Sequence, residues 1–196
     1  MNKTLHLQNT TAAALLKPES SLEKKLLAIP EFSIGLQWGT PRHGHPEGKI
    51  LFHIKDVLDN VDRIETACAQ TRERLRLLAF VHDTFKYQES AGRSPRDWNA
   101  HHAVIARRFM EAHSTDRPML NIIQWHDEAY YCWRLSEIYR YPEDGKARLE
   151  KLIEKVGSDI QLYYQFFLCD TRINGKNQAP VKWIEKYLPG IEPIKF

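Results

Sequence analysis

The chain has 196 residues, of which 42% are hydrophobic and 27% are charged. This balance excludes a disordered or collagen-like chain, and the length suffices for one domain with a sizeable core. The net charge of +3 is too small an excess to indicate a nucleic-acid-binding surface. No segment approaches the roughly 18 consecutive apolar residues of a membrane span, and the N-terminus lacks the apolar core of a secretory signal. We therefore expect a protein that neither enters a membrane nor is secreted.

The cysteines point to the same kind of protein. There are three, an odd number, at wide and unpatterned spacing: Cys68, Cys132 and Cys169. Such usage is typical of reduced thiols rather than of a disulfide framework. The sequence thus favours a cytoplasmic location, and it leaves open whether the chain forms a homo-oligomer.

Apolar residues recur three and four positions apart almost throughout, which predicts an all-α protein. Helices are expected over residues 10–17, 21–27, 50–64, 71–85, 99–113, 118–133 and 146–156, then after Ser158 and from Pro180 to just before Pro189. The stretch 30–48, with three prolines and four glycines, is typical of an irregular loop. We divide the chain into an N-terminal helical extension (1–29), a central helical domain (30–178) and a C-terminal helix with a tail (179–196), the two ends being loosely attached.

Several histidines and aspartates fall on the apolar faces of these helices. Positions three, four and seven apart share a helix face, so His82, four residues after Leu78 and three before Phe85, points inward. The same test places three more residues inward and puts His53 and Asp83 at the edges of their apolar stripes. The full set is His53, His82, Asp83, His102, His126 and Asp170.

Two interpretations of this set stay open on facing alone. A single inward histidine is typical of a hydrogen-bonded core residue, and Asp170 could pair with Arg172 or Arg107. However, a buried carboxylate needs a compensating partner, and one divalent ion or a pair of ions would satisfy all six side chains. Imidazole with carboxylate suits Mn, Fe, Co, Ni or Zn, and Mg with water as a further ligand. The absence of cysteine from the set argues against a structural zinc site.

The order of these residues resembles the H…HD…D pattern of the HD-domain metal-dependent phosphohydrolase superfamily. His53 stands for the first histidine, His82-Asp83 for the central pair and Asp170 for the last aspartate. Three segments add to the resemblance, which covers about residues 30–177: His82-Asp83-Thr84-Phe85-Lys86 is similar to the HD-x-x-K form, Trp125-His126-Asp127-Glu128 to the late histidine motif, and His45-Pro46-Glu47-Gly48 to the segment before the first histidine in bacterial CCA-adding enzymes.

The resemblance implies a single HD-domain-like helical bundle, with a metal site among its central helices, that hydrolyses phosphate esters. It implies that the first ion is held by His53, His82, Asp83 and Asp170. A second ion would be held by His102 and His126, with Asp83 bridging the two. His101 adjoins His102, and we choose His102 because of its facing and because Ala106 matches the small residue four positions later in the family. No nucleotidyltransferase domain accompanies the helices, so CCA addition is not expected.

The mechanism implied is attack by a metal-activated water on a nucleotide or a related small phosphorylated metabolite. Asp83, Lys86 and Asp127 are the expected catalytic residues: Lys86 would meet the phosphate charge, and Asp127 would orient an imidazole or act as a general base. Arg107 and Arg172 are candidate further phosphate contacts, although both also fit ordinary surface arginines. Two alternatives remain: a di-iron HD-type oxygenase that cleaves C–C or C–P bonds, and a non-catalytic metal-binding module that senses a nucleotide.

Overall fold

The computed structural model describes residues 11–42, 46–65, 68–89, 97–173 and 175–194. These residues are mostly helical and include no β-strand, which confirms the all-α prediction. No described helix is both long and apolar enough to cross a membrane. Residues 11–16 are helical, and the α-helices that follow are α2 (Ser21–Leu27), α3 (Pro30–Leu36), α4 (Ile50–Arg63), α5 (Ala69–Val81), α6 (His102–Glu111), α7 (Arg117–Trp125), α8 (Glu128–Trp133), α9 (Pro142–Val156), α10 (Ile160–Thr171) and α11 (Ala179–Tyr187).

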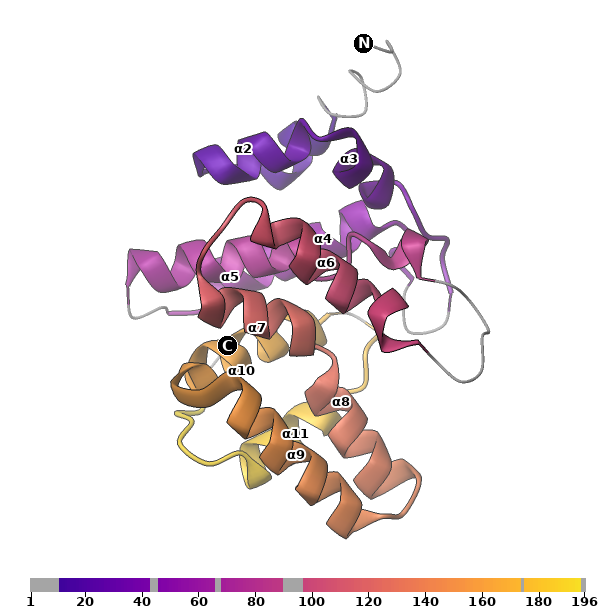
Figure 1. Ribbon diagram of the computed structural model, residues 1–196, viewed down its shortest axis with the longest axis vertical. Helices are drawn as coiled ribbons and strands as arrows, with labels where there is room; N and C mark the ends of the chain where they lie inside the picture. The colour runs from indigo at the N-terminus through magenta and orange to yellow at the C-terminus, as the bar shows by residue number, and fades with distance from the viewer. Residues whose placement is uncertain (1–10, 43–45, 66–67, 90–96, 174, 195–196) are drawn as a thin grey trace.

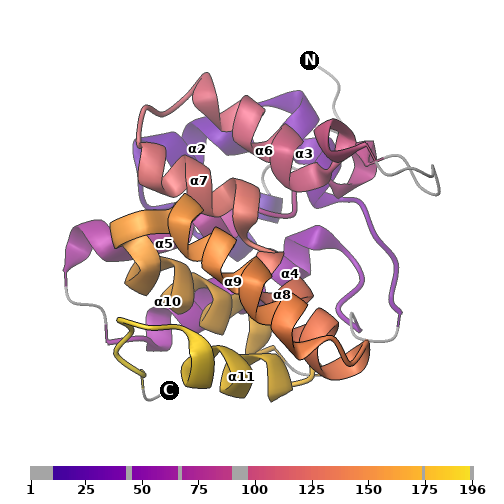
Figure 2. The same cartoon turned by 60° about the horizontal axis from the view of Figure 1, so that its bottom comes forward.

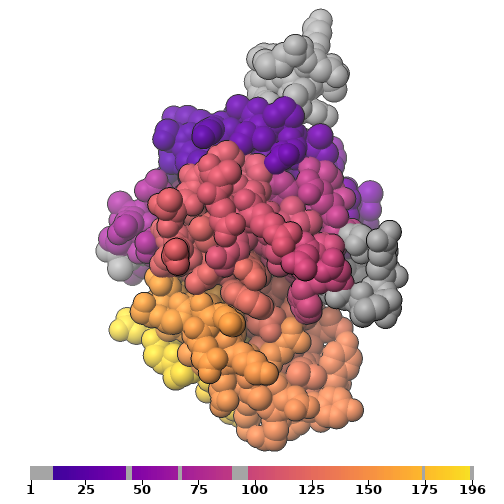
Figure 3. Space-filling view, in the orientation of Figure 1, coloured from indigo at the N-terminus to yellow at the C-terminus, as the bar shows by residue number. Residues whose placement is uncertain are grey.

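The helices form a layered bundle (Figure 1). Helices α2 and α3 lie across one end of a central group formed by α4, α5, α6 and α7, while α8, α9 and α11 lie toward the other end. Figure 2 shows α10 between α5 and α11, and α10 contacts both of them as well as α4. In the space-filling view the N-terminal helices cover one end and the C-terminal half forms the opposite one (Figure 3). Helices from distant parts of the chain therefore meet at the centre of the bundle.

The ends of the chain pack more firmly than expected. Leu26 of α2 and Ile184 of α11 are fully buried and belong to the same apolar core as the central helices. In addition, Arg76 of α5 is buried and donates to the carboxylate of Glu23 and to the main-chain carbonyl of Lys17. The three ranges into which the sequence was divided thus share one core.

Helix α3 lies where an irregular loop was expected, so that prediction is wrong for residues 30–36. Pro30 fits the first turn of a helix, where its missing N–H costs no hydrogen bond. Gly35 is a close-packing residue instead of a helix breaker, because a Cβ atom there would lie 1.9 Å from the carbonyl oxygen of Thr84. Helix α3 is thereby held directly against the turn that follows α5.

Two expected helices end or break early, and both interruptions carry candidate site residues. Helix α5 ends at Val81 instead of continuing to residue 85, so His82 and Asp83 lie in the turns after it. The helix expected over 118–133 is divided into α7 and α8 around His126 and Asp127. The Tyr163 hydroxyl, from α10, accepts a hydrogen bond from the Ala129 N–H and donates one to the Trp125 carbonyl, which satisfies backbone groups that the break leaves without helical partners.

Smaller differences concern helix starts. A short 3-10 turn, Trp98–Ala100, precedes α6, and α9 begins at Pro142 instead of residue 146. Ser158 does not cap α10, because a 3-10 turn, Gly157–Asp159, leads into that helix without a side-chain cap. By contrast, Ser20 caps α2, in a reciprocal pair with Glu23.

Candidate metal centre

Four imidazoles and two carboxylates converge at the centre of the bundle. His53 comes from α4, His102 from the first turn of α6 and Asp170 from α10, while the others come from the interruptions after α5 and α7. The imidazoles and Asp83 are buried, and the Asp170 side chain is 18% exposed. The structure therefore brings together all six of the residues predicted as metal ligands.

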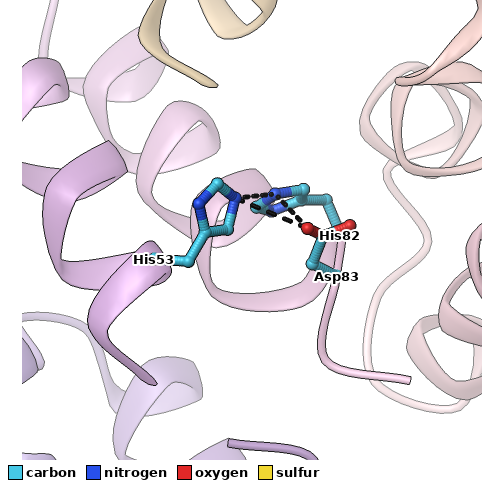
Figure 4. A group of neighbouring side chains, drawn as sticks. All are labelled: His53, His82 and Asp83. Atoms are coloured by element: carbon cyan, nitrogen blue, oxygen red, sulfur yellow. Dashed lines mark hydrogen bonds and ion pairs between the residues drawn. The ribbon is translucent and has the colours of Figure 1, made fainter. Parts of the chain in front are cut away.

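The first half of the cluster is the set of possible ligands His53, His82 and Asp83, which Figure 4 shows, with Asp170 beside it. The Nε2 atom of His53 lies 3.1 Å from Nε2 of His82, 3.4 Å from Oδ2 of Asp83 and 3.1 Å from Oδ1 of Asp170. Ligands that share one ion at about 2.1 Å are themselves about 3.0 to 3.4 Å apart. The spacing of His53, His82 and Asp83 fits one ion, and Asp170 lies close enough to His53 to be a further candidate ligand.

The second half consists of Asp83, His102 and His126. The Nε2 atom of His102 lies 3.4 Å from Nε2 of His126 and 3.4 Å from Oδ1 of Asp83, and the His126 nitrogen lies 3.5 Å from that same oxygen. The two oxygens of Asp83 thus face different halves of the cluster. Oδ1 is buried and accepts no hydrogen bond from the residues that the structure describes, which is a costly state for a carboxylate oxygen unless a cation is bound to it.

Backbone carbonyls fix the orientation of two of the imidazoles. The Nδ1 atom of His82 lies 3.1 Å from the carbonyl oxygen of Ala79, and Nδ1 of His126 lies 2.8 Å from that of Ile123. In each ring Nδ1 therefore donates a hydrogen bond to the carbonyl, and the lone pair of Nε2 is directed at the centre of the cluster. Such an outer hydrogen bond is typical of histidines that bind metal ions.

A carboxylate does the same for His102, and another lies beside His53. Nδ1 of His102 lies 2.6 Å from Oε2 of Glu89, and Nδ1 of His53 lies 3.5 Å from Oε1 of Glu47. Sequence reasoning did not assign a role to either glutamate. Glu47 belongs to the segment His45-Pro46-Glu47-Gly48, whose resemblance to a known motif was a sequence signal for it; His45 is outside the described residues. Glu89 follows a short 3-10 turn and carries no sequence signal.

The charge state of the cluster follows from burial and from its neighbours. Burial alone would raise the pKa of Asp83, but the charge of Lys86 and the surrounding imidazoles hold it well below its usual range. For His82 burial has the opposite effect and lowers the pKa of the imidazole. For His102 burial would lower the pKa, but the neighbouring carboxylates of Asp127, Asp83 and Glu89 outweigh it and raise the pKa to about 10. The carboxylates are thus anionic and available to a cation.

His101 has a different place from its neighbour. It is the N-cap of α6, where its Nδ1 atom accepts a hydrogen bond from the Ala103 N–H. Its Nε2 atom lies 4.0 Å from Oδ2 of Asp127. The set of neighbouring possible metal ligands that includes His101 contains Glu89 and His102 but not Asp83. The side chain that faces Asp83 is His102, the histidine chosen by helix facing.

A cavity of about 380 Å³ opens onto the cluster and supplies a route for a small molecule. Asp83, His126 and Asp170 form part of its wall, together with Lys86 and Asp127. The ammonium group of Lys86 is within 2.5 Å of Oδ2 of Asp83. Two of the expected catalytic side chains therefore lie beside the ligands, at the surface that a substrate would reach.

The two candidate arginines lie elsewhere. Arg107 donates to Glu111, Asn121 and Gln124 and is not among the residues that line the cavity. Arg172 lines a separate hollow. Neither is placed to contact a phosphate in this cavity as described. Instead a lysine that sequence reasoning missed, Lys176, lines the cavity and donates to Asp170; nothing in its sequence context marks it.

The structure thus gives a cluster that could hold one or two metal ions, and it does not identify the metal. Comparison with known proteins adds no further assignment: no family model, curated protein or solved structure matches this chain.

Proposed function

We propose that this protein is a metal-dependent phosphohydrolase that acts on a nucleotide or a related small phosphorylated metabolite. The observation that carries the proposal is the buried carboxylate of Asp83, whose two oxygens face two sets of imidazole nitrogens while Lys86 lies beside it at the cavity wall. A divalent ion bound there would lower the pKa of a bound water and polarise a phosphoryl oxygen.

The residues have separable tasks in this scheme. Lys86 supplies a positive charge at the cavity surface, where it can meet a phosphate oxygen. Asp127 lines the same cavity, and its carboxylate lies 3.4 Å from Nε2 of His102. The neighbouring cations hold the pKa of Asp127 well below its usual range even though burial would raise it, so it is anionic. Because so low a pKa makes the carboxylate a weak base, orienting an imidazole is the role that fits it.

The proposal also includes a cytoplasmic location. Cys68, Cys132 and Cys169 are free thiols, and two of them are buried, so the chain gains no disulfide that an oxidising compartment would maintain.

An Asp83→Asn variant tests the proposal. It keeps the shape of the side chain but removes its charge, and we expect loss of bound metal together with loss of phosphate release from a panel of phosphorylated metabolites in Mn²⁺ or Mg²⁺. Asp59→Asn is the matched control, because Asp59 is on α4 but its side chain is 44% exposed. Phosphate release by Asp83→Asn at the wild-type rate, with metal still bound, would overturn the proposal.

The same preparation separates the two alternatives. Bound iron, an absorbance change on exposure to oxygen and no phosphate release would assign the cluster to oxygenase chemistry, which four histidines and two aspartates also support. Stabilisation by nucleotides without turnover would assign it to sensing.

A further inference from the structure

A second lysine lies at the cluster in the same way as Lys86. Lys176, in the loop between α10 and α11, donates from Nζ to Oδ1 of Asp170 at 2.9 Å and to the main-chain oxygen of Asp170 at 2.8 Å. That carboxylate oxygen is the one that lies 3.1 Å from Nε2 of His53. Lys176 therefore borders the first half of the cluster, as Lys86 borders the carboxylate that both halves share.

The loop holds Lys176 in a defined position. The side-chain amide of Gln178 donates to the carbonyls of Thr171 and Lys176, at 2.9 and 3.0 Å. Gly175 has φ +85°, and a Cβ atom there would contact the ring of Pro46 at 3.5 Å, so the loop also lies against the segment that leads into α4. These contacts fix the backbone of Lys176 beside the cavity.

Charge at the cavity indicates what the two lysines are for. Lys86 and Lys176 both line it, as do the carboxylates of Asp83, Asp127 and Asp170. Two ammonium groups against three carboxylates leave one negative charge, which a single divalent ion reverses and a second ion turns strongly positive. With both ions bound the net charge of these groups is about +3, and a dianionic phosphomonoester offsets this excess better than a monoanionic diester does.

We propose that Lys176 is a substrate-binding residue that, together with Lys86, holds the terminal phosphoryl group of a phosphomonoester. The organic part of the substrate would lie against the apolar members of the same cavity wall: Tyr130, Phe167 and Pro180. This inference rests on the proposed function and names the substrate class that the site selects.

The inference makes a prediction that a purely structural role does not. Lys176 shares an Asp170 oxygen with the prospective ion, and like charges repel, so removing the lysine strengthens metal binding. The same change removes a charge-assisted hydrogen bond to the phosphate, which weakens anion binding. A lysine that only held the loop in place would weaken both when removed.

The experiment compares wild type with Lys176→Gln, Lys176→Arg and the control Lys182→Gln, which removes an exposed lysine that lines a different hollow. Mn²⁺ affinity is measured by competition with a coloured chelator, and binding of inorganic phosphate to the Mn²⁺-loaded proteins by calorimetry. For Lys176→Gln we expect phosphate binding to weaken roughly ten- to hundredfold while Mn²⁺ binding is unchanged or severalfold tighter. Lys176→Arg should retain most of the phosphate affinity.

Two results would overturn the inference: phosphate affinity equal to wild type in Lys176→Gln, or parallel losses of phosphate and Mn²⁺ affinity. Turnover of a monoester such as p-nitrophenyl phosphate by wild type distinguishes this failure from that of the proposed function. If wild type hydrolyses the ester and Lys176→Gln has an unchanged KM, only the inference fails. If wild type binds phosphate through Lys176 but hydrolyses no ester, the proposed function fails and the binding role stands.

Discussion

The Tyr163 hydroxyl connects α10 to the interruption between α7 and α8, where His126 and Asp127 lie, and we expect its removal to affect both stability and metal binding. Tyr163→Phe removes the acceptor of the Ala129 N–H and the donor to the Trp125 carbonyl, at 3.1 and 3.0 Å, with Tyr163 fully buried. Leaving a buried N–H without a partner costs about 1 to 3 kcal/mol. For a loss of about 2 kcal/mol, and about 2 to 4 °C per kcal/mol for a chain of this size, the melting temperature should fall by about 4 to 8 °C.

The assay is urea unfolding of the metal-free protein, followed by a metal titration of the folded variant. We expect the free energy of unfolding to fall by about 2 kcal/mol and the His126 half of the cluster to bind metal more weakly. Tyr164→Phe is the control: its hydroxyl donates to Glu185 at a partly exposed site, and its loss should cost less. Wild-type unfolding and wild-type metal stoichiometry in Tyr163→Phe would refute the argument that this hydroxyl maintains the break.

Three further predictions concern the groups around the ligands. Glu89→Gln removes the carboxylate that holds Nδ1 of His102. In a metal titration, binding of the ion on the His102 side should weaken roughly ten- to hundredfold, while the other ion binds as in wild type. Equal weakening of both ions would contradict this prediction. In the metal-free protein the pKa of His102 is raised to about 10, so the imidazole is protonated at neutral pH and metal binding must release a proton. Metal affinity should therefore rise with pH, and calorimetry in two buffers of different ionisation enthalpy should detect the released proton. Metal binding without proton release would contradict this prediction. Arg76→Ala leaves the buried Glu23 carboxylate without its cationic partner and should lower the free energy of unfolding by about 3 to 5 kcal/mol. An unchanged urea midpoint would show that the pair contributes nothing.

Helix facing was sufficient to predict the all-α fold and to select the side chains that gather at the centre. His82, for example, is identified by its spacing from Leu78, because it directly follows α5 and keeps the helical conformation, although Phe85 lies beyond the helix end. Facing also favours His102 over His101. These predictions succeed because a helix fixes the relation between sequence spacing and direction.

What sequence reasoning missed depends on contacts between distant segments. The break after Trp125 is stabilised by Tyr163, and α3 forms although it contains a glycine because Gly35 packs against Thr84. Neither relation is visible as a local pattern. The same limit explains the arginines: Arg107 appeared available for phosphate because its amide and carboxylate partners could not be inferred, whereas Lys176 gains its position only from the loop after α10.

The most direct test of the metal centre is an anomalous difference map from crystals of the wild-type protein grown with Mn²⁺. The account predicts one or two peaks beside the carboxylate of Asp83, each at about 2.0 to 2.3 Å from Nε2 atoms of the histidines on its side of the cluster. Crystals at saturating Mn²⁺ that show no peak there, with the imidazoles and carboxylates only hydrogen-bonded to one another, would contradict it.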